Sequence, residues 1–136
     1  MADTTDKKSL SLEGARKVLD AALAEAKKQK FNLSIAIVDE AGHLLSYARM
    51  DEAGLASVKV SIAKARAAAL FKRPTKFWEE SYATRPVIAH LPGALPIEGG
   101  LPLLVGGKVV GAIGCSGASS AQDGQVAAVA AATLGG

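Results

Sequence analysis

The sequence predicts a single α+β domain in which helices flank an antiparallel sheet. A chain of 136 residues is long enough to bury one sizeable core and too short for two domains. Segments with strand character come in pairs joined by tight turns, and helical segments lie outside these pairs. Strands joined in this way form hairpins and not parallel crossover units, which indicates an antiparallel sheet.

The N-terminal region is expected to hold a tail and one helix. Residues 1–10 are polar and charged and predict a flexible tail, so the domain itself spans residues 11–136. Ser11 can cap a helix that runs to about Lys28. From Leu12 onward, apolar residues recur at three- and four-residue spacing, which is typical of an amphipathic helix.

A first hairpin and a second helix follow. The apolar segment 33–38 and the returning segment 43–49 flank the turn residues 39–42, which predicts a hairpin. A helix is expected from about residue 56 to 71, because Pro74 prevents it from continuing.

The middle of the chain predicts a short helix and a long loop. Residues 76–82 form the short helix, and prolines and glycines leave little regular structure in residues 85–100. Such loops often carry function. A fifth strand is expected within residues 85–89.

The C-terminal third predicts a second hairpin and a last helix. Gly106-Gly107 separates two apolar segments, residues 101–105 and 108–115, and both glycines accept the positive φ of a two-residue turn. Ser120 and Asp123 have the spacing of a capping box before a helix that ends near Leu134.

Charge and cysteine content bound the class of protein. The net charge is +3, but the basic excess lies in residues 51–85 without the aromatic pattern of RNA-binding modules, so no nucleic-acid partner is expected. No apolar run reaches the roughly 20 residues that span a membrane, so no membrane association is expected. The single cysteine, Cys115, cannot form an internal disulfide, and we therefore expect a cytoplasmic protein. Its apolar neighbours predict a packed, inert thiol.

Two basic residues are candidates for ligand binding. Lys64 borders the buried face of the second predicted helix, either as a lysine whose stem covers apolar surface or as an ammonium that holds a carboxylate in a sheltered pocket. Arg49 either pairs with Asp51 or binds a ligand carboxylate with two hydrogen bonds.

Two further segments have alternative interpretations. In Glu98-Gly99-Gly100 the glycines either let the backbone approach a ligand or form a plain tight turn. Ser116 lies in a small-residue segment before the last helix, which can hold an anion or simply cap that helix. Gly111, Gly114 and Gly117 lack the spacing of a dinucleotide-binding loop, and their expected role is steric.

Several segments together resemble the GlcG/HbpS family, which also includes the C-terminal domain of PduO-type corrinoid adenosyltransferases. The resemblance covers residues 9–134 and is carried by the stretches Ile37–Leu44, Arg49-Met50-Asp51, Ala63-Lys64-Ala65 with Pro74-Thr75, Glu98–Pro102, and Gly111–Gly117 with Gln122-Asp123. It implies a profilin-like fold with a five-stranded antiparallel sheet, and assembly into dimers and larger rings. It also implies binding of haem or another small ligand.

These observations predict a cytoplasmic, homo-oligomeric binding protein. Its pocket is expected between the second helix, the Arg49 strand and the loop at residues 98–100. There, Lys64 and Arg49 would hold the carboxylates of haem or of a small metabolite. If haem binds, His90 is the favoured axial ligand, because a side chain in the long loop can lie over a pocket without disturbing the sheet.

Two other classes of function are open at this point. An enzyme acting on a small hydroxy- or oxo-acid would use Lys64 or Glu98 as acid or base and Ser116 as a hydrogen-bond donor. A purely structural assembly module would leave Lys64 and Arg49 bonded only to protein groups.

Overall fold

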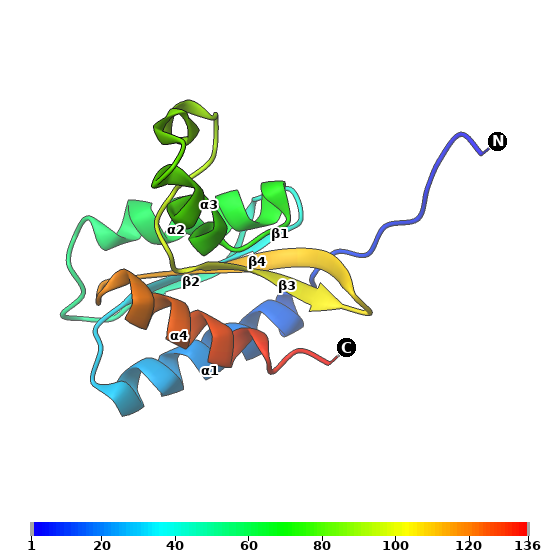
Figure 1. The fold of residues 1–136 in the computed structure, drawn as a ribbon. Helices are drawn as coiled ribbons and strands as arrows, with labels where there is room; N and C mark the ends of the chain where they lie inside the picture. Colours follow the sequence, from blue (N-terminus) through cyan, green and yellow to red (C-terminus); the bar gives the residue numbers. More distant parts are fainter. Residues whose placement is uncertain (1, 136) are drawn as a thin grey trace.

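The computed structural model describes residues 2–135, which form a four-stranded antiparallel sheet between two layers of helices (Figure 1). Helices α1 and α4 cover one face, and α2 covers the other. Helix α3 and the turn after it extend away from the sheet beyond α2. In chain order the elements are α1 (Leu12–Gln29), β1 (Ser34–Asp39), β2 (Leu44–Arg49), α2 (Ser57–Phe71), α3 (Thr75–Tyr82), the 3-10 helix η1 (Pro86–His90), β3 (Gly100–Val105), β4 (Lys108–Ser116) and α4 (Ser120–Ala131).

The sheet has the strand order β2-β1-β4-β3, so the two predicted hairpins are confirmed and lie side by side. The second hairpin turns at Gly106 and Gly107, whose φ angles of 59° and 76° are the positive values predicted for this turn. The central pair joins β1 to β4. One rung of this pairing places Arg49 beside Ser34 and Ser34 beside Ser116.

The prediction of a fifth strand is wrong for the residues that the structure describes. It was expected within residues 85–89, and residues 86–89 belong to η1 instead. Pro86 stands at the start of this turn, where its fixed φ suits a helical conformation. It has no N–H to donate to a neighbouring strand.

The ends of the outer helices follow local capping chemistry. Ser11 caps α1 as predicted, and its hydroxyl accepts a hydrogen bond from the Gly14 amide at 3.0 Å. The capping box predicted for α4 is wrong by one residue: it is formed by Ser119 and Gln122. Asp123 lies one position beyond the box, and its carboxylate is used elsewhere.

Two apolar clusters hold the layers together. The larger one fills the space between the sheet and the helices α1 and α4, and it contains Val18, Ile35, Ile113 and Val126. The smaller one lies under α2 and consists mainly of alanines with Val38. The small side chains let α2 pack very close to the sheet.

The N-terminal residues 2–9 contain no helix or strand and are exposed. The chain joins the domain at Leu10, which is buried and donates its amide hydrogen to the Val110 carbonyl at 3.0 Å. None of the helices in residues 2–135 combines the length and the apolar character needed to cross a membrane.

Candidate functional site

A buried ion pair joins the two helical layers at one end of the sheet. Lys64 on α2 is only 1% exposed, and its Nζ donates to Oδ2 of Asp123 at 3.1 Å and to the Cys115 carbonyl at 2.9 Å. The other carboxylate oxygen of Asp123 accepts a hydrogen bond from the Ala118 amide at 2.9 Å. Lys64 therefore links α2, β4 and α4 through protein groups.

The glycine pair before β3 makes room for this lysine. A Cβ atom at Gly99 would lie 2.7 Å from Lys64 Nζ, and one at Gly100 would overlap the Lys64 carbonyl oxygen. The Gly100 amide donates to the Thr75 hydroxyl at 2.9 Å. The close approach predicted for these glycines is thus an approach to Lys64 within the chain.

The neighbouring acid also contacts protein groups. The Glu98 amide donates to Oε1 of Glu79 on α3 at 3.0 Å, and the Glu98 side chain lies against Gly124 on α4. Glu98 is half-buried. Lys64, Glu98, Gly99 and Gly100 therefore do come together at this end of the sheet, as the sequence led us to expect.

The remaining two predicted residues lie on one rung of the same sheet. Arg49 is exposed on the edge strand β2, while Ser116 at the end of β4 is 8% exposed, and Ser34 lies between them. The Ser34 hydroxyl shares a hydrogen bond with the Ser57 hydroxyl at 2.7 Å, which puts this rung on the face covered by α2. Arg49 is thus two strands away from Ser116, and Ser116 is the nearer of the two to the ion pair.

The buried cysteine supplies little reactivity. Burial raises the pKa of the Cys115 thiol far above its ordinary value, the Asp123 carboxylate adds to this rise, and the Lys64 ammonium opposes it. Only a thiolate is a strong nucleophile or metal ligand. The structure confirms that Cys115 is buried, and its pKa accords with the expected inert thiol.

A separate pocket of about 480 Å³ lies in the segment that extends beyond α2. It is lined mostly by apolar side chains, together with one indole, one guanidinium and one imidazole: Trp78, Arg85, Val87, Ile88, His90, Leu91 and Pro92. His90, the predicted iron ligand, is an exposed member of this lining. The pocket is distinct from the one expected near Arg49 and Lys64.

The indole in this pocket has a buried donor without an acceptor. Trp78 is 8% exposed, and its Nε1 makes no hydrogen bond to any residue within 2–135. Its ring is held by edge contacts with Phe71 and Phe77, each with ring centroids 5.1 Å apart. A buried tryptophan N–H usually has a hydrogen-bond partner, so Trp78 is an exception within residues 2–135.

Three residues of these sites were missed from the sequence. Asp123 is the only charged residue of α4, and Trp78 is the only tryptophan of the chain. Because each is the only residue of its kind there, either could have been singled out from the sequence as a candidate. Arg85 has no comparable signal, because it stands among many exposed basic residues. Within residues 2–135, no three His, Cys, Asp or Glu side chains are arranged to hold a metal ion by themselves.

Fold and pocket together define an α+β domain with a largely apolar pocket that is also lined by one guanidinium and one imidazole. Residues 10–132 match the family model described as haem-degrading protein HbpS-like, and the chain belongs to this family. It is 42% identical to protein GlcG of Escherichia coli strain K12 over 114 residues, which cover 79% of this chain and 81% of GlcG.

Comparison with solved structures agrees with this family assignment. A double mutant of HbpS from Streptomyces reticuli superposes with a TM-score of 0.91 at 35% identity, covering 100% of this chain and 94% of that one. A complex of PduOC with haem superposes with a TM-score of 0.84 at 28% identity, covering 93% of this chain and 95% of that one. The resemblance inferred from the sequence is therefore confirmed.

Proposed function

We propose that this protein binds haem in the pocket formed by α3, η1 and the residues that follow η1. The observation that carries the proposal is the buried, unpartnered Nε1 of Trp78 in a pocket that also presents His90 and Arg85. An unpaired buried donor costs about 1–3 kcal/mol, which a ligand acceptor would recover.

The chemistry of the lining fits this group. Val87, Ile88 and Leu91 offer an apolar surface to the macrocycle. The imidazole of His90 is the one lining group that commonly ligates haem iron, and the guanidinium of Arg85 suits a propionate. A volume of about 480 Å³ lies within the usual range for cofactor pockets.

This proposal moves the ligand away from Lys64. Asp123 already neutralises the Lys64 ammonium, and at 1% exposure that group has little access to a ligand carboxylate or to a substrate proton. Arg85 takes the charge-pairing role instead. A small carboxylate metabolite would use the same Arg85 and Trp78 donors without the iron, and it is the second ligand that this pocket suits.

Haem titration tests the proposal. We expect haemin to give a shifted Soret band, His90→Ala to abolish that shift, and Trp78→Phe to weaken binding about 2- to 12-fold through loss of one hydrogen bond. His43→Ala is the matched control, because His43 is an exposed histidine outside this pocket. A Soret shift that survives His90→Ala would contradict histidine ligation, and absence of haem binding would leave the small carboxylate as ligand.

We also propose that the protein is a homo-oligomer. The apolar sequence of the last helix, together with the nearly uncharged second hairpin, predicts an oligomer contact there, but α4 buries Val126, Ala127 and Ala130 within the domain. Five of the exposed large apolar side chains lie on the segment from α3 to the start of β3, and the others are spread over the remaining elements; the five are Phe77, Tyr82, Val87, Leu91 and Ile97. Apolar surface concentrated in this way is typical of protein contacts.

The assembly is tested by light scattering. We expect a mass well above 13.8 kDa for the natural chain. Ile97→Asp should lower this mass, because Ile97 is 41% exposed within the apolar segment. Leu12→Asp, at an equally exposed position on α1, should leave it unchanged. A monomeric natural chain at micromolar concentration would rule out the assembly. If Val129→Asp dissociates the protein and Ile97→Asp does not, the contact lies on α4.

The cytoplasm is the proposed location. The single thiol, Cys115, is buried and not available for pairing. This is the state expected of a protein that functions in a reducing compartment.

A further inference from the structure

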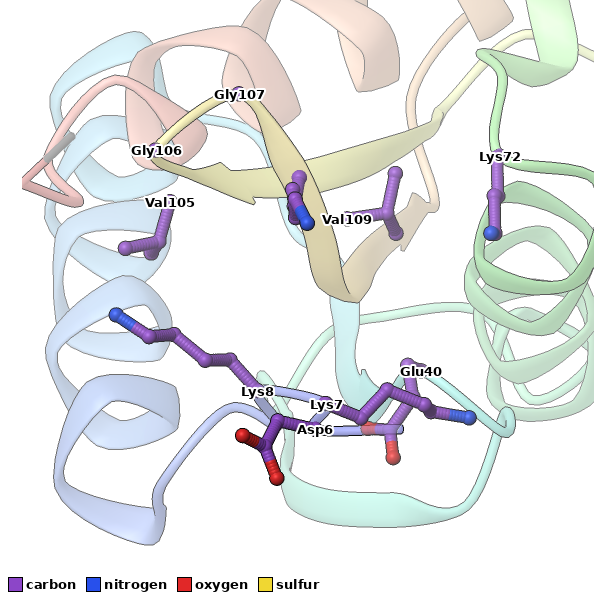
Figure 2. Close-up of a pocket in the computed structure, with 10 residues that line it drawn as sticks. Asp6, Lys7, Lys8, Glu40, Lys72, Val105, Gly106, Gly107 and Val109 are labelled. Atoms are coloured by element: carbon purple, nitrogen blue, oxygen red, sulfur yellow. The ribbon is translucent and has the colours of Figure 1, made fainter. Parts of the chain in front are cut away.

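A second cavity, of about 840 Å³, lies at the end of the sheet that carries both hairpin turns (Figure 2). This end is opposite the Lys64–Asp123 pair. Its walls come from the N-terminal segment, the first hairpin turn, the end of α2 and the second hairpin, and the lining residues are Asp6, Lys7, Lys8, Glu40, Lys72, Val105, Gly106, Gly107, Lys108 and Val109.

Positive charge dominates this cavity. Four lysines line it against two carboxylates, and within residues 2–135 none of the four forms an ion pair. Glu40 instead accepts a hydrogen bond from the Ser9 hydroxyl at 2.5 Å. In Figure 2 the carboxylates of Asp6 and Glu40 point away from Val105 and Val109. The acids that share the cavity therefore leave its ammonium groups unneutralised.

The backbone places these four lysines around the same cavity. Lys72 follows α2 in the left-handed conformation, with φ 55°, which costs a non-glycine residue about 1–2 kcal/mol. Lys108 follows directly on the turn of the second hairpin. Lys7 and Lys8 precede Leu10, whose amide is bonded to β4. Three separate segments thus each contribute lysines to the cavity lining. Backbone features of these segments, and not contacts of the lysine side chains, fix their positions.

We propose that this cavity binds a small organic anion with two or more negative groups, such as a polycarboxylate or an organic phosphate. Four lysines that form no ion pair within the described residues line one cavity, so an anion with several negative groups could attract more than one of them at once. Val105 and Val109 offer an apolar surface to the carbon body of such a ligand. Because none of the described lining residues is aromatic, the cavity lacks the stacking surface of a nucleic-acid site. The proposal does not depend on haem binding.

Calorimetric titration of the full-length protein with citrate and with inorganic pyrophosphate tests this site. We expect at least one of them to bind, and raising the ionic strength from about 10 mM to about 100 mM should weaken that binding, because the Debye length shortens from about 30 Å to about 10 Å. Lys72→Gln combined with Lys108→Gln should weaken it about tenfold or more. The matched control combines Lys17→Gln with Lys28→Gln, two exposed lysines of α1 outside the cavity.

The outcomes separate this proposal from its rivals. Equal loss of affinity in the control pair would show unspecific attraction to net charge, and would overturn the site. The site would also be overturned if neither anion bound. Binding only to vesicles of acidic phospholipid would overturn it as well, because the lysines would then belong to a membrane-binding surface. The Soret titration of the Lys72/Lys108 variant should match that of the natural chain, so failure of haem binding and failure of this site are distinguishable.

Discussion

Replacing Lys64 with methionine is expected to lower the free energy of unfolding by about 3–5 kcal/mol. Methionine fills much of the space of the lysine stem, but it leaves the Asp123 carboxylate buried with only the Ala118 amide as partner. Breaking a buried ion pair by removing one charge costs this much because the other charge stays desolvated. Urea unfolding followed by circular dichroism measures the change.

A second substitution provides the control. Combining Lys64→Met with Asp123→Asn removes both charges, so the double variant should be more stable than Lys64→Met alone. Haem affinity of the folded variant should be unchanged, since Lys64 lies outside the Trp78 pocket. A loss below about 1 kcal/mol would contradict the structural role of the pair. A loss of haem affinity without loss of stability would assign Lys64 to ligand binding.

Replacing Gly114 with alanine is expected to cost about 3 kcal/mol, the upper part of the usual range for overpacking. A Cβ atom at this position would overlap the Ser61 carbonyl oxygen and would crowd the Ala65 amide. Both are backbone atoms of α2, so the helix as a whole would have to move away from β4. The same unfolding measurement applies, with the slope against urea concentration unchanged.

Gly54→Ala is the matched control for this substitution. No heavy atom lies within 4 Å of a Cβ at Gly54, and its φ is not positive. Its stability should stay within about 0.5 kcal/mol of the natural chain. Equal stability of both variants would mean that α2 does not rest directly on β4.

The elements that were predicted correctly are those with local signals. The turn at Gly106-Gly107 requires positive φ at both positions, which glycine adopts easily. The apolar spacing after Ser11 indicates a helix with one buried face. Both signals are local in the sequence. The wrong prediction of a strand within residues 85–89 arose because a short apolar segment between turns suits a strand or a 3-10 turn equally well. Pro86 was the local signal that favours the turn.

The candidate sites depend more on distant contacts. The periodicity of α2 showed that Lys64 borders the buried face, but its partner Asp123 lies on another helix, and no local pattern connects the two. The same holds for Trp78, which meets His90 only because α3 and η1 fold against each other. His90 could be named as a candidate ligand because it lies in a long loop, but the sequence did not show where its pocket lies. Only the tertiary structure shows that.

The central pair of the sheet has a consequence for synthesis of the chain. Strand β1 pairs with β4, yet residues 34–39 leave the ribosome long before residues 111–116. Until β4 emerges, one edge of β1 has no partner, and the four central residues of this strand are apolar. An unpaired apolar edge favours aggregation, so the nascent protein is exposed to this risk until β4, the last strand, has been made.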